Sequence, residues 1–197
     1  MIDISFIYHY NKFDYLYIIL YYIKSKMALF QTKTFAKDDE YMTPYYAWKN
    51  IEKYLPKDKV IWEAFYGDGT SKNSLNKLGC TNVIHKDIDF FEHNLGEVII
   101  SNPPFTLKKK VLYRLAEIDK PFILIMPCST ITTQYFRKTF SNKNIQIIIP
   151  RSRIQFSRKN TDKTINRCNF DCFYYCYKMN LPKDILHLGD EENCKIK

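Results

Sequence analysis

The chain of 197 residues has no internal repeat, no low-complexity linker and no apolar run long enough to cross a membrane. Its longest apolar stretch, residues 13–23, reaches about half the length of a membrane-spanning helix. No basic segment precedes this stretch and no Ala-x-Ala-like cleavage site follows it, which argues against a secretory signal. We therefore expect an intracellular protein, in the cytoplasm or nucleus of a host cell, with no membrane partner.

Cysteine spacing of the kind that binds a metal ion is also lacking. Cys168, Cys172 and Cys176 recur every four residues, but the aromatic segment around them is typical of a strand. On a strand, positions four apart are roughly 13 Å apart, so three such sulfurs cannot meet at one ion. We expect no metal site, and we interpret the six cysteines as reduced and mostly buried.

The composition predicts one globular domain, since 46% of the residues are hydrophobic and 26% are charged. A net charge of +9 favours a polyanionic partner, nucleic acid before an acidic membrane surface, although an A/T-rich genome would also inflate Lys, Asn, Ile and Tyr. We expect a monomer. Because Met27 opens a segment that resembles an ordinary start, we expect a dispensable extension over 1–26, the domain over 27–180 and a loose tail over 181–197.

Short apolar runs alternate with helical stretches along the chain, which predicts a Rossmann-like α/β domain with a mostly parallel sheet and helices on both faces. The expected strands are 60–65, 82–87, 97–100, 122–126, 145–149 and 171–177. The expected helices begin at Thr43-Pro44, as N-cap and first helical residue, and otherwise cover about 70–78, 108–118 and 133–140.

A rigid corner follows the third of these strands: Asn102, Pro103, Pro104 and Phe105. Neither proline can donate a ladder hydrogen bond and both fix φ, so the backbone is stiff and leaves the sheet. Open α/β sheets place their chemistry at such carboxyl ends of strands. Two carbonyl acceptors and an aromatic face at this corner suit a planar ring that bears an amino group.

A turn with two glycines, Phe65-x-Gly67-x-Gly69, follows the first strand and precedes a helix. Glycines there permit positive φ and close approach of a nucleotide-like ligand, and no Gly-Lys-Ser/Thr follows to make a P-loop. Asp87 ends the next strand, where an acid can bind ribose hydroxyls, although by itself it also fits an ordinary surface or capping acid.

In this order the motifs resemble the S-adenosylmethionine-dependent N6-adenine DNA methyltransferases, in the small-phage or large-DNA-virus form. The family's Asp/Asn/Ser-Pro-Pro-aromatic hallmark is matched by residues 102–105, and its Asp/Glu-x-Phe-x-Gly-x-Gly loop by residues 63–69. Its upstream motif is similar to Tyr41-Met42-Thr43-Pro44. The resemblance covers about 38–179 and implies an enzyme with S-adenosylmethionine as cofactor.

The resemblance also implies roles for single residues. Glu63 or a neighbour would receive the cofactor's ammonium, Asp87 would bind its ribose, and Asp89 and Phe90 its adenine. The cofactor residues implied in this way are Tyr41, Thr43, Pro44, Glu63, Phe65, Gly67, Gly69, Asp87, Asp89 and Phe90.

For catalysis, Asn102 and the Pro103 carbonyl would accept the two hydrogens of the target amine, beside Pro104, and Phe105 would stack on the target ring. Methyl transfer then depends mainly on in-line placement, and a base in a duplex must first be flipped out. Two features depart from the family: the segment from Gly69 to Asn102 leaves one helix-plus-strand connection compressed or lost, and a separate target-recognition domain is lacking.

A basic loop supplies evidence about the partner. Within residues 151–167 six basic residues face only Asp162, a net charge of +5, with Gln155 and Phe156 among them. A solvated charged loop is the plain alternative. The residues expected to contact nucleic acid are Lys108, Arg151, Arg153, Arg158 and Lys159.

Four functions fit these motifs. DNA is expected as the substrate ahead of RNA, where the target would be a cap-adjacent or structural adenosine. The same corner could also methylate a protein glutamine amide. A non-catalytic nucleic-acid-binding module is the remaining alternative.

Overall fold

The computed structural model describes residues 41–158 and 170–189. The chain divides into two units, Met1–Ala36 and Lys37–Lys197, and the described residues all belong to the second. The expected N-terminal extension over 1–26 therefore lies outside the described residues.

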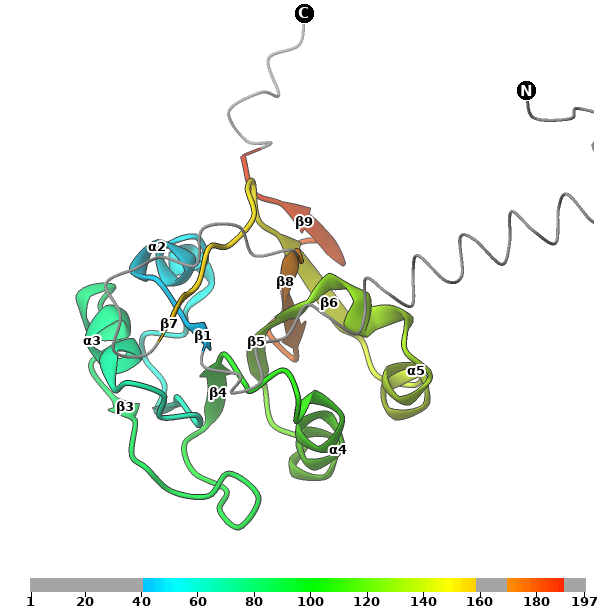
Figure 1. Ribbon diagram of the computed structural model, residues 1–197, viewed down its shortest axis with the longest axis horizontal. Coiled ribbons are helices and arrows are strands. Elements are labelled where there is room, and N and C mark those ends of the chain that lie inside the picture. Colours follow the sequence, from blue (N-terminus) through cyan, green and yellow to red (C-terminus); the bar gives the residue numbers. More distant parts are fainter. Residues whose placement is uncertain (1–40, 159–169, 190–197) are drawn as a thin grey trace, which may run out of the picture. The chain divides into compact units, whose positions relative to one another are not determined.

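A seven-stranded sheet forms the centre of the domain, in the order β3-β2-β4-β5-β8-β6-β9 (Figure 1). Only β8 runs antiparallel to its neighbours β5 and β6, and the other pairings are parallel. The strands are β2 (Ile61–Trp62), β3 (Val83–Ile84), β4 (Val98–Ser101), β5 (Phe122–Pro127), β6 (Ile145–Ile149), β8 (Cys172–Tyr177) and β9 (Ile185–His187). A separate antiparallel pair joins β1 (Tyr41–Met42) to β7 (Ser157–Arg158).

Helices cover both faces of the sheet, with α2 and α3 on one side and α4 and α5 on the other (Figure 1). They are α2 (Tyr45–Lys49), α3 (Thr70–Lys77), α4 (Lys108–Ile118) and α5 (Gln134–Phe140), with short 3-10 turns η2 (Glu52–Tyr54) and η3 (Cys128–Thr132). The predicted fold class, a Rossmann-like α/β domain with a mostly parallel sheet, is confirmed.

The core forms where the apolar stripe of α4 meets the sheet. Val111, Leu112 and Leu115 recur at helical spacing and pack with Ile99 of β4 and Leu124 of β5. Every residue of β5 is buried, as expected for a central strand that has helices on its two faces.

Tyr174 of β8 ties the sheet to α2. Its side chain is fully buried, and its hydroxyl donates to the Ala47 carbonyl at 2.7 Å while accepting from Asn50 at 3.4 Å. A buried polar group without a hydrogen-bond partner destabilises the folded state, so these two hydrogen bonds hold α2 at a fixed position on the sheet.

Substituting Tyr174→Phe should lower the free energy of unfolding by about 1–3 kcal/mol, because the Ala47 carbonyl would stay buried without a donor. Urea denaturation measures the change. Tyr113→Phe, at a side chain 41% exposed on α4, is the matched control and should be neutral. Equal stability of the Tyr174 variant and the wild type would contradict this role.

The connection from β3 to β4 contains no helix and no strand over residues 85–97, as the short spacing in the sequence predicts. Gly96 makes the tight return possible: its φ is +61°, and a Cβ there would lie 2.8 Å from the Val60 carbonyl oxygen. No other residue type fits this position without a backbone shift.

The boundaries of several predicted elements change. The strands predicted over 60–65 and 82–87 keep only two paired residues each, because the chain leaves the sheet early to form the turns described below. Pro44 is the N-cap of α2 rather than its first residue. The loop predicted over 151–167 contains β7, and its residues 159–167 lie outside the described part.

The loose tail predicted over 181–197 is wrong for its first part. Residues Ile185–His187 form β9, parallel to β6, and the buried amide of Gln146 bonds the backbone of Leu181 and Lys183. Three strand residues in a polar sequence give little indication of a strand by themselves, and it is the pairing with β6 that makes them one. Residues 190–197 lie outside the described part.

Candidate active site

A cavity of about 700 Å³ opens at the carboxyl ends of β2, β3 and β4. Eleven of the residues proposed from the sequence line it, from four separate segments of the chain. They are Tyr41, Thr43, Glu63, Phe65, Gly67, Asp87, Asp89, Phe90, Asn102, Pro103 and Pro104. The structure therefore brings the upstream motif, the glycine turn, the acids and the Pro-Pro corner together around one space.

Other residues in the wall were not among the predicted site residues. Met42, Ala64, Tyr66, Asp68 and Ile88 are sequence neighbours of motif residues, so the walls of the turns could have been inferred from them. Ser71, Phe91 and Leu107 begin helices or follow a turn and carried no signal. They line the cavity too.

Asn102 is held in one orientation by the upstream motif. Its Nδ2 donates to the Tyr41 carbonyl oxygen at 3.0 Å, which leaves the Oδ1 oxygen as the free end of the amide. Among the described residues no donor reaches this buried oxygen. A buried acceptor without a partner costs about 1–3 kcal/mol, so an oxygen kept in this state calls for a ligand or a functional explanation.

Phe105 does not line the cavity, which corrects the expectation that it presents a face to a target ring. Its side chain is 1% exposed and stacks on Tyr41, with ring centroids 5.5 Å apart. Phe156 and Phe170 contact it edge-on. A phenyl ring gains more from such neighbours than from water, and the sequence does not show which segments fold over it.

Three neighbouring strand ends place Glu63, His85 and Ser101 side by side. Trp62 is in register with Ile84 and with Ile99, so Glu63 after β2 lies level with His85 after β3 and next to the end of β4, whose last residue is Ser101. Glu63 Oε2 lies 2.5 Å from His85 Nε2, and the Ser101 hydroxyl donates to Glu63 Oε1. All three side chains are buried.

Burial raises the pKa of Glu63, and its bonds to His85 and Ser101 only partly offset this. Burial alone would lower the pKa of His85, but the hydrogen bond and negative charge of Glu63 outweigh it, so the pKa of His85 is raised. Both shifts favour a pair that keeps one proton between its two members.

The cavity is acidic although the chain is basic. Four of its described lining residues are carboxylates, and none of those described is Lys or Arg: the acids are Glu63, Asp68, Asp87 and Asp89. Asp68 accepts from the Thr70 amide at the start of α3 at 3.0 Å, and Asp89 accepts from the Phe91 amide at 2.7 Å. Those two carboxylates fix turns, whereas Asp87 makes no such contact with the described residues.

The glycine turn passes close to the upstream motif. Gly67 has φ +57°, and a Cβ there would lie 3.1 Å from the sulfur of Met42. A side chain at this position would therefore strain the backbone and crowd the wall of the cavity. Gly69, with φ +82°, serves as the N-cap of α3 and does not line the cavity, and neither does Pro44.

The basic residues proposed to contact nucleic acid differ in their surroundings. Arg153 forms two bonds to the Asp171 carboxylate, at 2.8 and 3.1 Å, and Lys108 donates to the Phe105 carbonyl at 3.3 Å. Arg158 pairs with Tyr41 through the β7–β1 ladder, which brings the end of the basic loop to the cavity wall. Lys159 lies outside the described residues.

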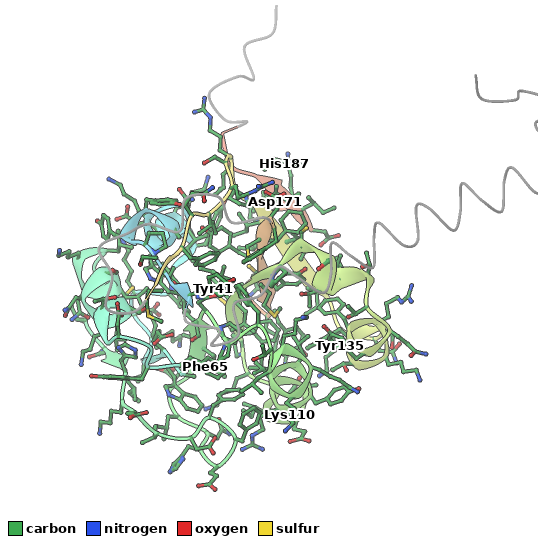
Figure 2. All side chains as sticks on the ribbon, in the orientation of Figure 1. Tyr41, Phe65, Lys110, Tyr135, Asp171 and His187 are labelled. Carbon is green, nitrogen blue, oxygen red and sulfur yellow. The ribbon has the colours of Figure 1, made fainter. Side chains whose placement is uncertain are left out.

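Arg151 belongs with the other edge of the domain, where its side chain lies beside Gly189. Figure 2 shows Asp171 and His187 on the side of β9, and Phe65 on the side of β3. Of the described basic residues in the loop, the structure thus places only Arg158 next to the segments that form the cavity.

No family model and no curated protein matches the chain. Among solved structures it is similar to TrmN from Thermus thermophilus, with 9% identity and a TM-score of 0.25 over 55% of this chain. The match spans 32% of the TrmN chain, about a third of its length. A likeness at this level assigns no activity.

Among the described residues, no group of three or more His, Cys, Asp or Glu side chains is placed to hold a metal ion. Within the same residues, no helix is both long and apolar enough to cross a membrane.

Proposed function

We propose that the protein transfers a methyl group from S-adenosylmethionine to an exocyclic amine, the N6 amine of adenine in DNA. The observation that supports this most is the Asn102 Oδ1 oxygen, a buried acceptor without a partner among the described residues, in the wall of an acidic cavity. A hydrogen-bond acceptor can bind the N–H groups of an amine, and carboxylates can bind a methyl donor that carries positive charge.

The charge of the cavity favours this cofactor over nucleotides that carry phosphates. S-adenosylmethionine bears a sulfonium and an ammonium, which carboxylates stabilise, while phosphates would meet four acids and, in the described wall, no Lys or Arg. A volume of about 700 Å³ is within the usual range for sites of this kind. Gly67 lets a ligand approach the backbone, and Asp87 has a free carboxylate for ribose hydroxyls.

Asn102 and the corner would act on the methyl acceptor. Oδ1 and the Pro103 carbonyl accept the two hydrogens of the amine, which favours a pyramidal nitrogen and stabilises its developing positive charge. When bound, the cofactor supplies an activated methyl group on its sulfonium. The prolines keep the two oxygens in place, so that the chain contributes orientation rather than a strong base.

Adenine and DNA are the finer part of the proposal. They rest on the Asn-Pro-Pro-Phe resemblance and on the charge of the basic loop, whose β7 reaches Tyr41. Stacking of a target ring on Phe105 would require Tyr41 to leave its present place. A protein glutamine amide is the second candidate, because it needs no aromatic face and Phe105 is covered.

A labelled-methyl transfer assay tests the proposal. DNA, RNA and a protein mixture are offered in parallel, and labelled products are digested to nucleosides or amino acids for identification. Label in N6-methyldeoxyadenosine supports the proposal, and label in N6-methyladenosine or methylglutamine would move the substrate to RNA or protein. Transfer to none of the three by protein that binds the cofactor would contradict the proposed reaction.

A further inference from the structure

His85 and Ser101 have no part in the proposed reaction, although both contact Glu63 in the wall of the cavity. Glu63 lines the cavity, and Ser101 is the residue before Asn102. The register of β2 with β3 and β4 places the residues that follow β2 and β3 beside the last residue of β4, so the group of Glu63, His85 and Ser101 lies at the carboxyl ends of these strands.

The charges of this group are isolated from water. The side chains of Glu63 and His85 are each 1% exposed, and the ring of Tyr66 covers His85 with centroids 4.9 Å apart. A buried ion pair keeps its charges only while both partners are present. From the other elements the groups that face the pair are the Ser101 hydroxyl, the Tyr66 phenol, and Asp68, Asp87 and Asp89 in the same cavity.

We propose that His85 is a positioning residue: the proton it shares with Glu63 holds this carboxylate between the ends of β3 and β4, and the proton leaves when a cationic ligand occupies the cavity beside Glu63. The ligand part of this inference rests on the proposed function, and the shared proton does not.

The direction of the effect follows from charge. With the proton present, the pair is neutral and offers a cation little. An ammonium beside Glu63 would face the imidazolium across a carboxylate in a buried site, where like charges repel strongly. Loss of the proton leaves a net negative charge that binds the cation. Binding should therefore release a proton and strengthen as pH rises toward the His85 midpoint.

Calorimetry with S-adenosylmethionine in buffers of different ionisation enthalpy measures the proton directly. Below the His85 midpoint the wild type should release about one proton per ligand and bind about tenfold more tightly for each pH unit. His85→Gln keeps a donor for Glu63 but removes the imidazole, so the proton release and the pH dependence that arise from the imidazole should be lost. His187→Gln, at an exposed residue of β9, is the matched control and should behave as the wild type.

Proton release by His85→Gln equal to that of the wild type would overturn the proposal. Imidazole titration by NMR provides a second reading on the unliganded wild type, which needs no variant. The pKa of His85 should lie above the ordinary range of a histidine, and a midpoint within or below that range would overturn the shared proton. Failure of the wild type to bind S-adenosylmethionine or its demethylated product would refute the proposed function and the ligand step together. A raised His85 midpoint in that sample would still support the shared proton.

Discussion

Asn102→Ala should reduce methyl transfer by about 10²–10³-fold while leaving the affinity for S-adenosylmethionine within about threefold of the wild type. The reason is geometric, since Oδ1 is the buried oxygen without a partner and the cofactor residues belong to other segments. Transfer rates under saturating cofactor, together with calorimetry, separate the two effects.

The stability of this variant distinguishes a functional residue from a structural one. Alanine removes a buried acceptor that lacks a partner, which offsets part of the lost bond to the Tyr41 carbonyl. The melting temperature should therefore change little, as at sites where stability is given up for activity. Asn76→Ala on the exposed face of α3 is the matched control. Wild-type transfer by Asn102→Ala would contradict the role of Oδ1.

Asp87→Ala should weaken binding of S-adenosylmethionine by about 10- to 100-fold, the loss expected for one or two hydrogen bonds to a carboxylate. Asp87 is the acid of the cavity whose carboxylate fixes no turn among the described residues, so the fold should not depend on it. The transfer rate at saturating cofactor should stay near that of the wild type.

Titration calorimetry with the cofactor and with its demethylated product measures the change. Asp184→Ala, at an exposed residue that precedes β9, is the control and should bind as the wild type does. An unchanged dissociation constant for Asp87→Ala would show that the ribose, or the ligand as a whole, binds elsewhere. A loss of transfer with full binding would assign Asp87 to the reacting end of the site.

The elements that the sequence predicts best are those with a strong local signal. Helix α4 and strand β6 have the predicted bounds, because apolar residues at helical spacing or in an unbroken run leave one interpretation. β9 was missed because its order comes from β6, which is about 35 residues away. Strand propensity depends on the residues of one segment and carries no information about the strand with which that segment pairs.

In the site, too, residues within local motifs were predicted, and residues whose position depends on distant segments were not. Motif spacing was sufficient to collect eleven wall residues, since carboxyl ends of parallel strands meet at one edge. Motif spacing was insufficient to predict the burial of Phe105, because the rings that cover it, Tyr41, Phe156 and Phe170, come from three other segments. His85 was missed because its contact with Glu63 depends on strand register, which a single sequence does not fix.

The place of β8 has a consequence for synthesis on the ribosome. Residues Cys172–Tyr177 enter the sheet between β5 and β6, two strands made earlier; all of them pair with β5, and the last four pair with β6. Until those residues leave the exit tunnel, two apolar strands have open edges that can associate with other nascent chains. Folding must then wait for nearly the whole polypeptide, so translation that stops before residue 172 should yield aggregates instead of a smaller folded domain.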